Sequence, residues 1–422
     1  MRATFYFLLV IIPLNLFAQK EKESYLAKNS FDLNKDTFVF PQDNFKIIGF
    51  GAYHGSSKTE LVELDLLRSL TKQKAIKHYL PETDYSIAHY FNTFLKTGDT
   101  ILLKDLVTLY GMRVPQERTI EVYKKWKELK VINDALAPND KLTVVGIDIQ
   151  VNYKYVSKHI LELIKAKPET FKTVQAIHEM VQTDTTSYAL GDLSYAHHIL
   201  KDFVTDYENN PTTYAGYVTE KQNLEHIIKN LKISFDFNSN YRNRGQIMFN
   251  NYNDLAPVYD FKNKPQFLRM GFSHIMKSRE GASGYPYFFT LLIEQQVYRK
   301  EQVLSVMGYL TESTVVWDEL YDEQGNYTGY TTEAGFGIGD YDKEYFRGIT
   351  QLKNQHLSDK TLFRLNKKKS PYAVKEPDLI EIIMEGKKSN SEDVKGMSTL
   401  RFIDYAVLIK DSTASVPIFE MD

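Results

Sequence analysis

Four apolar segments recur along the chain, and each is followed by a turn and then by a run with helical periodicity. This alternation of strand and helix predicts parallel βαβ units, in which helices cover both faces of a sheet. The segments are residues 45–54 (FKIIGFGAYH), 75–84 (AIKHYLPETD), 142–150 (LTVVGIDIQ) and 265–274 (PQFLRMGFSH). We therefore expect an α/β fold with a mixed, mainly parallel β-sheet covered by helices on both faces.

Two stretches depart from this alternation. Residues 153–240 carry no strand-like run and contain the loop clusters QTDTTS and ENNPTT, which predicts a helical insert over the sheet. Residues 309–337 alternate around Gly325 and Asn326, which predicts a β-hairpin. The last strand candidate is FIDYAVLIK, residues 402–410.

The first residues have the features of a secretory signal peptide. Met1 and Arg2 precede an apolar run at residues 5–17, which ends at Ala18 and is shorter than the roughly 20 residues that span a bilayer. We expect cleavage after Ala18 (signal peptide, residues 1–18) and export to the periplasm or the medium without a stable membrane anchor. Residues 19–422 would then form a single domain, and an uncleaved anchor is the alternative.

Composition narrows the class of partner. The chain has no cysteine, so an exported form cannot use disulfides and must be held together by its core. With 52 basic and 54 acidic side chains the net charge is −2, which creates no overall field for nucleic acid or anionic lipid. A small molecule or a peptide is the expected substrate, and the 29 tyrosines and 25 phenylalanines suit a bulky, partly apolar one.

Ionisable residues follow the apolar segments. In open α/β sheets, ligands bind beyond the carboxyl ends of the strands. The residues found there are His54, Glu82 with Asp84, Asp148 and His274. Such side chains are rarely buried unless paired, so their recurrence predicts a functional site, although each taken alone also fits a turn or a helix cap. Tyr53, Asp84 and Asp148 are the candidates for substrate contacts.

Two of the segments end in the same short pattern. Gly51 precedes His54 by three residues, and Gly271 precedes His274 by three residues. Glycine at these positions allows a sharp turn or a close approach of another segment. The repeated Gly-x-x-His pattern strengthens the prediction that both histidines begin functional loops.

With these motifs the chain resembles the erythromycin esterase-like family. The segment FGAYHGS is similar to that family's Gly-Glu-x-x-His-Gly motif, YLPETD to its Leu-Glu-Ala-Asp strand, and VVGIDIQ to its Gly-x-Asp strand. RNRGQIMFNNY is similar to its Arg-Asp-x-x-Met-x-x-Asn helix, with Arg244, Met248 and Asn251 in register. The wider superfamily includes ChaN-like haem-iron-binding lipoproteins and the TIKI/TraB metalloproteases.

The chain also departs from the family pattern. The family's first-motif glutamate falls on Gly51, the first histidine of its His-Asn-x-His motif falls on Gly271, and Gly245 follows Arg244 in place of aspartate. Of the family's catalytic set, His54, Glu82 and His274 remain. Two Gly-x-x-His motifs resemble the TIKI/TraB branch, whereas the strand order and the C-terminal tail resemble the esterase-like branch.

Three functions follow as hypotheses. In the first, His54 takes a proton from water, Glu82 orients the imidazole or the water, and His274 or Arg244 stabilises the oxyanion of an ester or amide intermediate. In the second, His54, Glu82 and His274 also bind a divalent metal, which would be Zn²⁺, Mn²⁺ or Fe²⁺. In the third, the protein is a catalytically inactive periplasmic ligand-binding or scaffold protein.

Overall fold

The computed structural model describes residues 19–41, 44–182, 188–191, 194–236, 243–334 and 340–421. The predicted signal peptide, residues 1–18, lies outside the described residues. In the described part of the chain, no helix combines the length and the apolar character that crossing a membrane requires.

An eight-stranded sheet with the order β1-β11-β13-β6-β2-β5-β3-β4 forms the centre of the fold. β6 pairs in parallel with both β2 and β13, and β3 pairs in parallel with β4, whereas β11 is antiparallel to β1 and β13. The strands are β1 (Ser30–Asp32), β2 (Ile47–Gly51), β3 (His78–Pro81), β4 (Thr143–Val144), β5 (Gln266–Met270), β6 (Val303–Thr311), β11 (Lys360–Arg364) and β13 (Tyr405–Lys410). The predicted mainly parallel α/β fold is confirmed.

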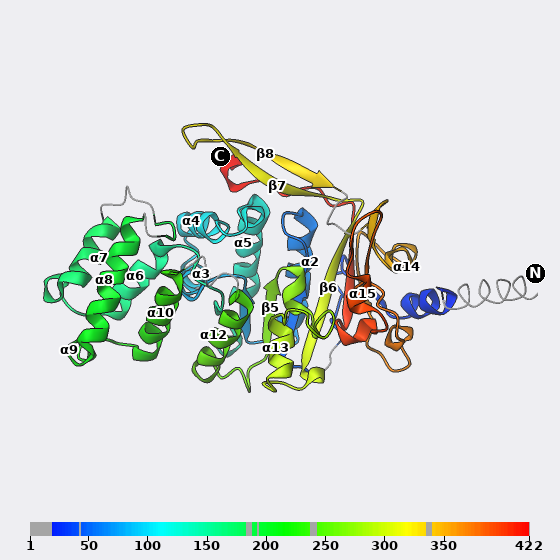
Figure 1. Ribbon diagram of the computed structural model, residues 1–422, viewed down its shortest axis with the longest axis horizontal. Helices are drawn as coiled ribbons and strands as arrows, with labels where there is room; N and C mark the ends of the chain where they lie inside the picture. The colour runs from blue at the N-terminus through cyan, green and yellow to red at the C-terminus, as the bar shows by residue number, and fades with distance from the viewer. Residues whose placement is uncertain are drawn as a thin grey trace, which may run out of the picture. The chain divides into compact units, whose positions relative to one another are not determined.

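Two small antiparallel sheets accompany the large one. β7 (Thr314–Tyr321) and β8 (Tyr327–Ala334) lie side by side as the predicted hairpin (Figure 1). Gly325 supports its turn with a φ of +81°, a conformation that glycine adopts at little cost. The other sheet has the order β12-β10-β9, with β9 (Asp340–Tyr341), β10 (Glu344–Phe346) and β12 (Ile382–Met384).

The chain divides into two compact units. The first unit contains the residues up to Ala75 together with Arg269–Pro417, and the second contains Ile76–Leu268 and the residues from Ile418 onward. Every residue of β2 and β6 is buried, so these strands form the core of the first unit. Helices of the first unit are α2 (Ser57–Lys72), α13 (Phe288–Glu294), α14 (Ile349–Asn354) and α15 (Ser391–Val394), with short 3-10 helices such as η5 (Phe272–Ile275) and η6 (Lys300–Gln302).

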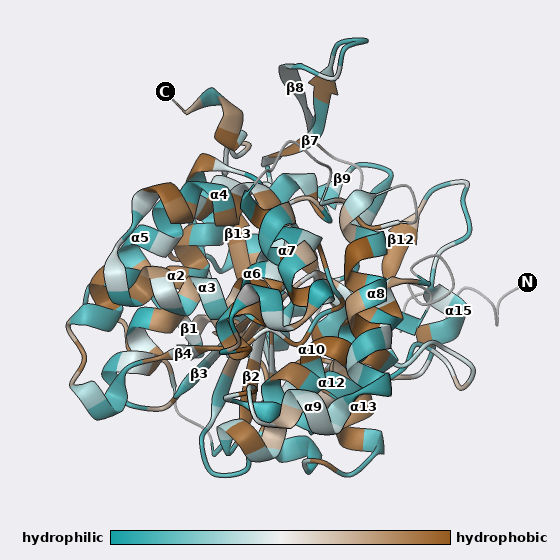
Figure 2. Cartoon of the chain, turned by 90° about the vertical axis from the view of Figure 1, so that its left-hand side faces the viewer, coloured by the Kyte–Doolittle hydropathy of each residue, from teal (hydrophilic) through white to brown (hydrophobic). Residues whose placement is uncertain are grey.

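The second unit is mainly helical. Its helices are α3 (Tyr85–Thr97), α4 (Thr100–Tyr110), α5 (Ile120–Asp134), α6 (Tyr153–Leu163), α7 (Lys172–Gln182), α8 (Tyr195–Asn209), α9 (Pro211–Ala215), α10 (Lys221–Ser234) and α12 (Arg244–Tyr259). The predicted insert corresponds to α6 through α10, the green helices of Figure 1. These helices carry brown, hydrophobic stretches beside teal, hydrophilic ones (Figure 2), as expected when one helix face packs inward.

Candidate functional site

A buried ionic cluster lies at the ends of β3 and β4 in the second unit. Glu82 directly follows β3, and Asp148 lies four residues after β4. The Arg244 guanidinium donates to both carboxylates, at 2.6 Å from Glu82 Oε1 and 2.5 Å from Asp148 Oδ2. A second bond joins Arg244 Nε to Asp148 Oδ1 at 2.8 Å, so the pair with Asp148 is bidentate.

Arg113 completes this cluster, and the sequence analysis missed it. Its Nη1 donates to Glu82 Oε1 at 3.2 Å, its Nη2 donates to the Glu82 carbonyl at 2.9 Å, and Nη2 lies 3.3 Å from Asp148 Oδ2. It belongs to the loop after α4, where no motif marks it. The only signal in the sequence was a charge imbalance at the predicted site. Two carboxylates, Glu82 and Asp148, need compensating cations if they are buried, and Arg244 alone would leave a net negative charge.

Burial and the neighbouring charges shift the pKa values of this cluster in opposite directions. Burial would raise the pKa of Asp148, but Arg113 and Arg244 outweigh it and hold that pKa below its ordinary value. For Arg244, burial lowers the pKa, and Asp148 and Glu82 more than compensate, so the guanidinium stays charged. With two guanidiniums and two carboxylates, the cluster is close to neutral overall.

Helix α12 delivers Arg244 to the cluster from its first turn. Met248, one turn later, is fully buried, and Asn251, a further turn on, donates to the Ile147 carbonyl at 3.1 Å. Asn251 also exchanges hydrogen bonds with Asn230 of α10, at 2.9 Å and 3.2 Å. Arg244 and Asn251, two of the three residues in register with the family's helix, therefore fix the chain around Asp148.

Asp84 lies beside the cluster but is bonded as a helix cap. Its Oδ1 accepts from the Ile87 backbone N–H at 2.9 Å at the start of α3, and its Oδ2 accepts from Val151 N–H at 3.0 Å and Gln150 Nε2 at 3.2 Å. Burial raises the pKa of Asp84 to about 6, although these backbone bonds oppose the shift. These contacts are structural, and a substrate contact by Asp84 stays a prediction.

The loop that carries His54 is fixed within the first unit. The Gly55 carbonyl accepts from the backbone N–H of Val316 in β7 at 2.9 Å and from that of Ser415 at 2.8 Å. Gly55 has a φ of +80°, and the Ser57 N–H donates to the Thr413 carbonyl at 3.0 Å. The hairpin and the C-terminal tail thus hold the backbone beside His54, where α2 begins.

The second Gly-x-x-His motif lies against the first. His274 belongs to η5, and a side chain at Gly51 would place its Cβ 2.7 Å from Ile275 Cγ1 and 3.2 Å from the Phe272 carbonyl oxygen. Tyr53 packs on Phe272, with ring centroids 6.1 Å apart, and burial raises the pKa of Tyr53 to about 12. Gly51 is therefore required for this packing, which leaves no room for the family's glutamate at that position.

A second buried ionic group ties together the two elements that flank these motifs. Arg269 of β5 lies 3.5 Å from Glu63 and 3.9 Å from Glu60, both on α2. All three side chains are at most 4% exposed, and the guanidinium stacks over the Phe50 ring at 5.4 Å. This group fixes β5, which leads to His274, against α2, which follows His54.

The structure thus brings the predicted residues together in two sets. Glu82, Asp148 and Arg244 share one cluster in the second unit, and the segments bearing His54 and His274 are neighbours in the first. Among the described residues, no group of three or more His, Asp or Glu side chains is arranged to hold a metal ion.

No protein-family model matches the sequence, and no curated protein matches it significantly. Comparison of structures nevertheless shows that the chain shares its α/β fold with solved proteins that include an erythromycin esterase.

A mutant of erythromycin esterase EreC in its open conformation aligns with a TM-score of 0.56 and 11% identity, covering 89% of this chain and 93% of the esterase. A Bacillus cereus protein solved by structural genomics aligns with a TM-score of 0.60 and 16% identity, covering 94% of this chain and 99% of its own. A protein described as a succinoglycan biosynthesis protein gives a TM-score of 0.60 and 15% identity, with 94% and 98% covered. At these identities the comparison establishes the fold.

Proposed function

We propose that the protein is an exported hydrolase that cleaves an ester or amide bond with a water molecule activated by His54 and Glu82. The observation that carries this proposal is the buried cluster in which two guanidiniums hold Glu82 and Asp148 at the strand ends. Buried charges at the carboxyl ends of strands are costly and cluster at functional sites. The fold shared with an esterase supports the same conclusion.

Each residue has one task in this mechanism. An imidazole can act as a general base toward water, and we assign this role to His54. The water oxygen attacks the carbonyl carbon, and the proton then passes to the leaving oxygen or nitrogen as the bond to carbon breaks. We assign His274 to the oxyanion of the intermediate.

Arg244 and Arg113 orient the Glu82 carboxylate through hydrogen bonds. Glu82 Oε1 accepts from both guanidiniums, and the proposed role of Glu82 is to orient the water or the His54 imidazole. Arg244 is the alternative to His274 for the oxyanion, and its guanidinium already donates to two carboxylates. Tyr53, Asp84 and Asp148 stay as proposed substrate contacts.

A divalent metal at His54, Glu82 and His274 is the second form of the proposal, with Zn²⁺, Mn²⁺ or Fe²⁺ as the ion. The two guanidiniums against Glu82 disfavour a cation beside that carboxylate. Elemental analysis of untagged protein after loading with Mn²⁺ or Zn²⁺ tests this form. A stoichiometric ion that is lost in His274→Ala supports it, and an empty protein contradicts it.

A catalytically inactive ligand-binding or scaffold protein is the alternative function. Each carboxylate of the cluster is bonded to a guanidinium, an arrangement that also suits a purely structural role. The departures at Gly51 and Gly271 from the family pattern favour the same alternative. Measuring substrate turnover distinguishes the hydrolase from the inactive alternative.

The decisive experiment measures hydrolysis across a panel of nitrophenyl esters, lactones and amides. We expect turnover by the wild type and a loss of about 10² to 10⁴-fold in His54→Ala, the range that a general base supplies. His356→Ala is the matched control, because His356 is an exposed histidine of the same unit, and it should leave turnover unchanged. Full activity in His54→Ala contradicts the mechanism, and no wild-type turnover on any substrate favours the inactive alternative.

Export is part of the same proposal. When the full chain is expressed in a bacterium with an outer membrane, we expect the protein in the periplasmic fraction, starting at Gln19. N-terminal sequencing checks the cleavage site. A chain that retains Met1 and sediments with membranes would support the uncleaved anchor.

A further inference from the structure

The first unit contains a cavity that is not lined by any of the residues assigned to hydrolysis. Its volume is about 480 Å³. Polar and charged side chains dominate its lining, which includes Asn44, Lys277, Lys300, Glu301, Asn366 and Asp404.

This cavity lies at the amino-terminal edge of the parallel strands. Lys300 belongs to η6, directly before β6, and Asp404 directly precedes β13. β2 and β13 both run parallel to β6, whereas His54 follows the carboxyl end of β2. Five residues of strand separate the two edges by about 16 Å, so the cavity is distinct from the His54 loop.

Lys277, one of the two lysines that line the cavity, forms a buried ion pair with Asp404. Lys277 Nζ lies 2.7 Å and 2.6 Å from the two oxygens of Asp404, and their side chains are only 3% and 8% exposed. Asp404 also accepts from the Ser305 N–H at 2.9 Å. Asp404 therefore neutralises Lys277 and has little capacity left for a second cation.

Lys300 is the cation without such compensation. In the part of the chain that the structure describes, it forms no ion pair. Burial and the neighbouring charge of Lys277 lower the pKa of Lys300, Asp404 opposes this, and Arg401 lowers it further. An anion in the cavity would supply the opposite charge that Lys300 lacks.

We propose that this cavity binds a small molecule through an oxyanion, a carboxylate or a phosphate group that contacts the Lys300 ammonium. Asn366 lines the same cavity, and its Oδ1 accepts from Arg364 Nε at 3.0 Å, a bond that orients its amide. Leu304 and Leu400 line the same cavity and provide apolar contacts for the remainder of the ligand. Glu301 at the rim opposes the anion.

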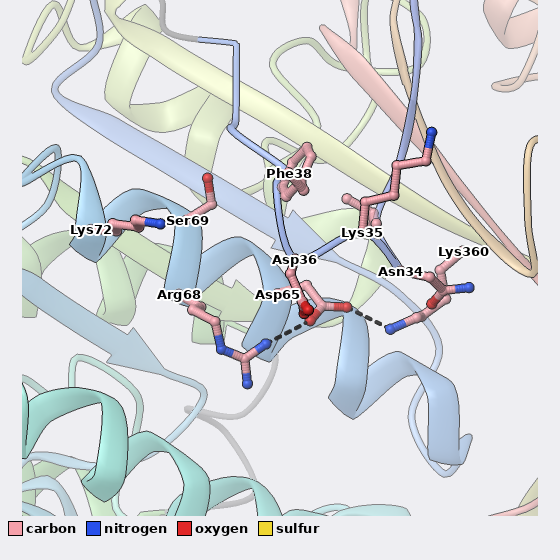
Figure 3. Close-up of a pocket in the computed structure, with 10 residues that line it drawn as sticks. Asn34, Lys35, Asp36, Phe38, Asp65, Arg68, Ser69, Lys72 and Lys360 are labelled. Atoms are coloured by element: carbon pink, nitrogen blue, oxygen red, sulfur yellow. Dashed lines mark hydrogen bonds and ion pairs between the residues drawn. The ribbon is translucent and has the colours of Figure 1, made fainter.

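In another cavity of the first unit, the lysines are either paired with a carboxylate or exposed to solvent. It has a volume of about 330 Å³ and lies between residues 33–38 and α2 (Figure 3). There Asp65 is bonded to Arg68 at 3.0 Å and to Lys360 at 2.5 Å, the two dashed contacts of Figure 3. Lys72 also lines this cavity but is exposed to solvent, so its charge is already hydrated. Lys72 thus provides a matched control residue.

Calorimetric titration of the full-length protein with inorganic phosphate, and separately with citrate, tests the proposal at low chloride concentration and pH 7. We expect saturable binding of at least one probe by the wild type. In Lys300→Gln the affinity should fall at least tenfold, because the charge that contacts the oxyanion is gone. Phosphate alone binding points to a phosphate ligand, and citrate alone to a carboxylate ligand; both outcomes support the oxyanion site.

Two further variants make the test decisive. Glu301→Gln should strengthen binding, since it removes the opposing charge without touching Lys300, and Lys72→Gln should leave it unchanged. Urea unfolding of each variant confirms that it is folded. No binding of either probe, equal affinity in Lys300→Gln, or loss of binding in Lys72→Gln would each overturn the proposal. Hydrolysis by His54 is a separate readout, so failure here leaves the proposed function untouched.

Discussion

Arg113 and Arg244 face Glu82 and Asp148 in an arrangement where every charge has an opposite partner within 3.3 Å. Such pairs contribute little net stability compared with apolar side chains of the same size, because all four charges were taken from water. Removing one member is costly, however, since it leaves a buried charge uncompensated. The cluster therefore fixes geometry more than it adds free energy.

Arg113→Met should lower the free energy of unfolding by about 3 kcal/mol at pH 7. This is the cost of leaving a buried carboxylate without one of its two guanidinium partners. Asp148 has a lowered pKa in the folded protein, so its stabilisation is present above its unfolded pKa and is lost as the pH falls through the folded value. The difference between variant and wild type should therefore shrink below about pH 4. Urea titrations at several pH values measure it, and a pH-independent difference would contradict this account.

At Gly51 the packing has no room for any side chain, not even a methyl group. A Cβ there would lie 2.7 Å from Ile275 Cγ1 and 2.9 Å from its Cδ1. Gly51→Ala should therefore cost about 1 to 3 kcal/mol of stability through overpacking, and adding Ile275→Val should recover part of it. Gly216→Ala is the control, since nothing lies within 4 Å of a Cβ at Gly216. Equal stability of Gly51→Ala and wild type in thermal unfolding would disprove the packing role.

At the scale of elements, α12 and the extended chain after β4 depend on each other. The helix carries Arg244 at its start and Asn251 two turns later, and both contact residues 147–148. An asparagine donating to a backbone carbonyl satisfies a buried acceptor that has left the regular ladder of a strand. The side chains of α12 thus take over the role that strand pairing plays further along the sheet.

Asn251→Ala should lower stability by about 1 to 3 kcal/mol, because it removes the hydrogen bonds that the Ile147 carbonyl and Asn230 Oδ1 accept from the Asn251 amide. Asn250→Ala, one residue earlier on the exposed face, should change stability by less than about 0.5 kcal/mol. Chemical unfolding of the two variants gives the comparison. Similar losses in both would contradict the role of the buried hydrogen bonds.

At the scale of the whole molecule, buried histidines set the response of the second unit to acid. Burial lowers the pKa of His78 to about 4, of His159 to about 3 and of His226 to about 4. Their unfolded forms take up protons near pH 6.5, so their contribution to stability is complete above that pH and is lost as the pH falls toward 4. Asp84, with its pKa raised to about 6, acts in the opposite direction between about pH 4 and 6.

Three histidines outweigh one aspartate, so the second unit should lose stability between pH 7 and pH 5. The two tryptophans allow a direct measurement, because buried Trp126 belongs to the second unit and Trp317 to the first. In Trp317→Phe, fluorescence reports Trp126 alone, and its urea midpoint should fall over this pH range. His226→Gln should flatten the dependence. A midpoint that is constant or rises toward pH 5 would contradict the assignment of buried neutral histidines.

Much of the fold could be read from local periodicity, because an apolar strand run and the helix after it are visible within some 20 residues. The hairpin and the helical insert followed in the same way. β6 was not predicted, because it leads into the hairpin strand β7 and not into a turn and a helical run, the pattern by which the other buried strands were identified. β1 and β11 are short strands at the antiparallel edge, where pairing depends on distant chain segments.

The sequence by itself determined which ionisable residues follow the strands, because strand ends are set by short-range patterns. Only the tertiary structure decided which of them meet. Arg244 is 96 positions from Asp148 and 162 from Glu82, and Arg113 is 31 from Glu82. No local pattern encodes such pairings, since they arise from the requirement that every buried charge be compensated once the whole chain has packed.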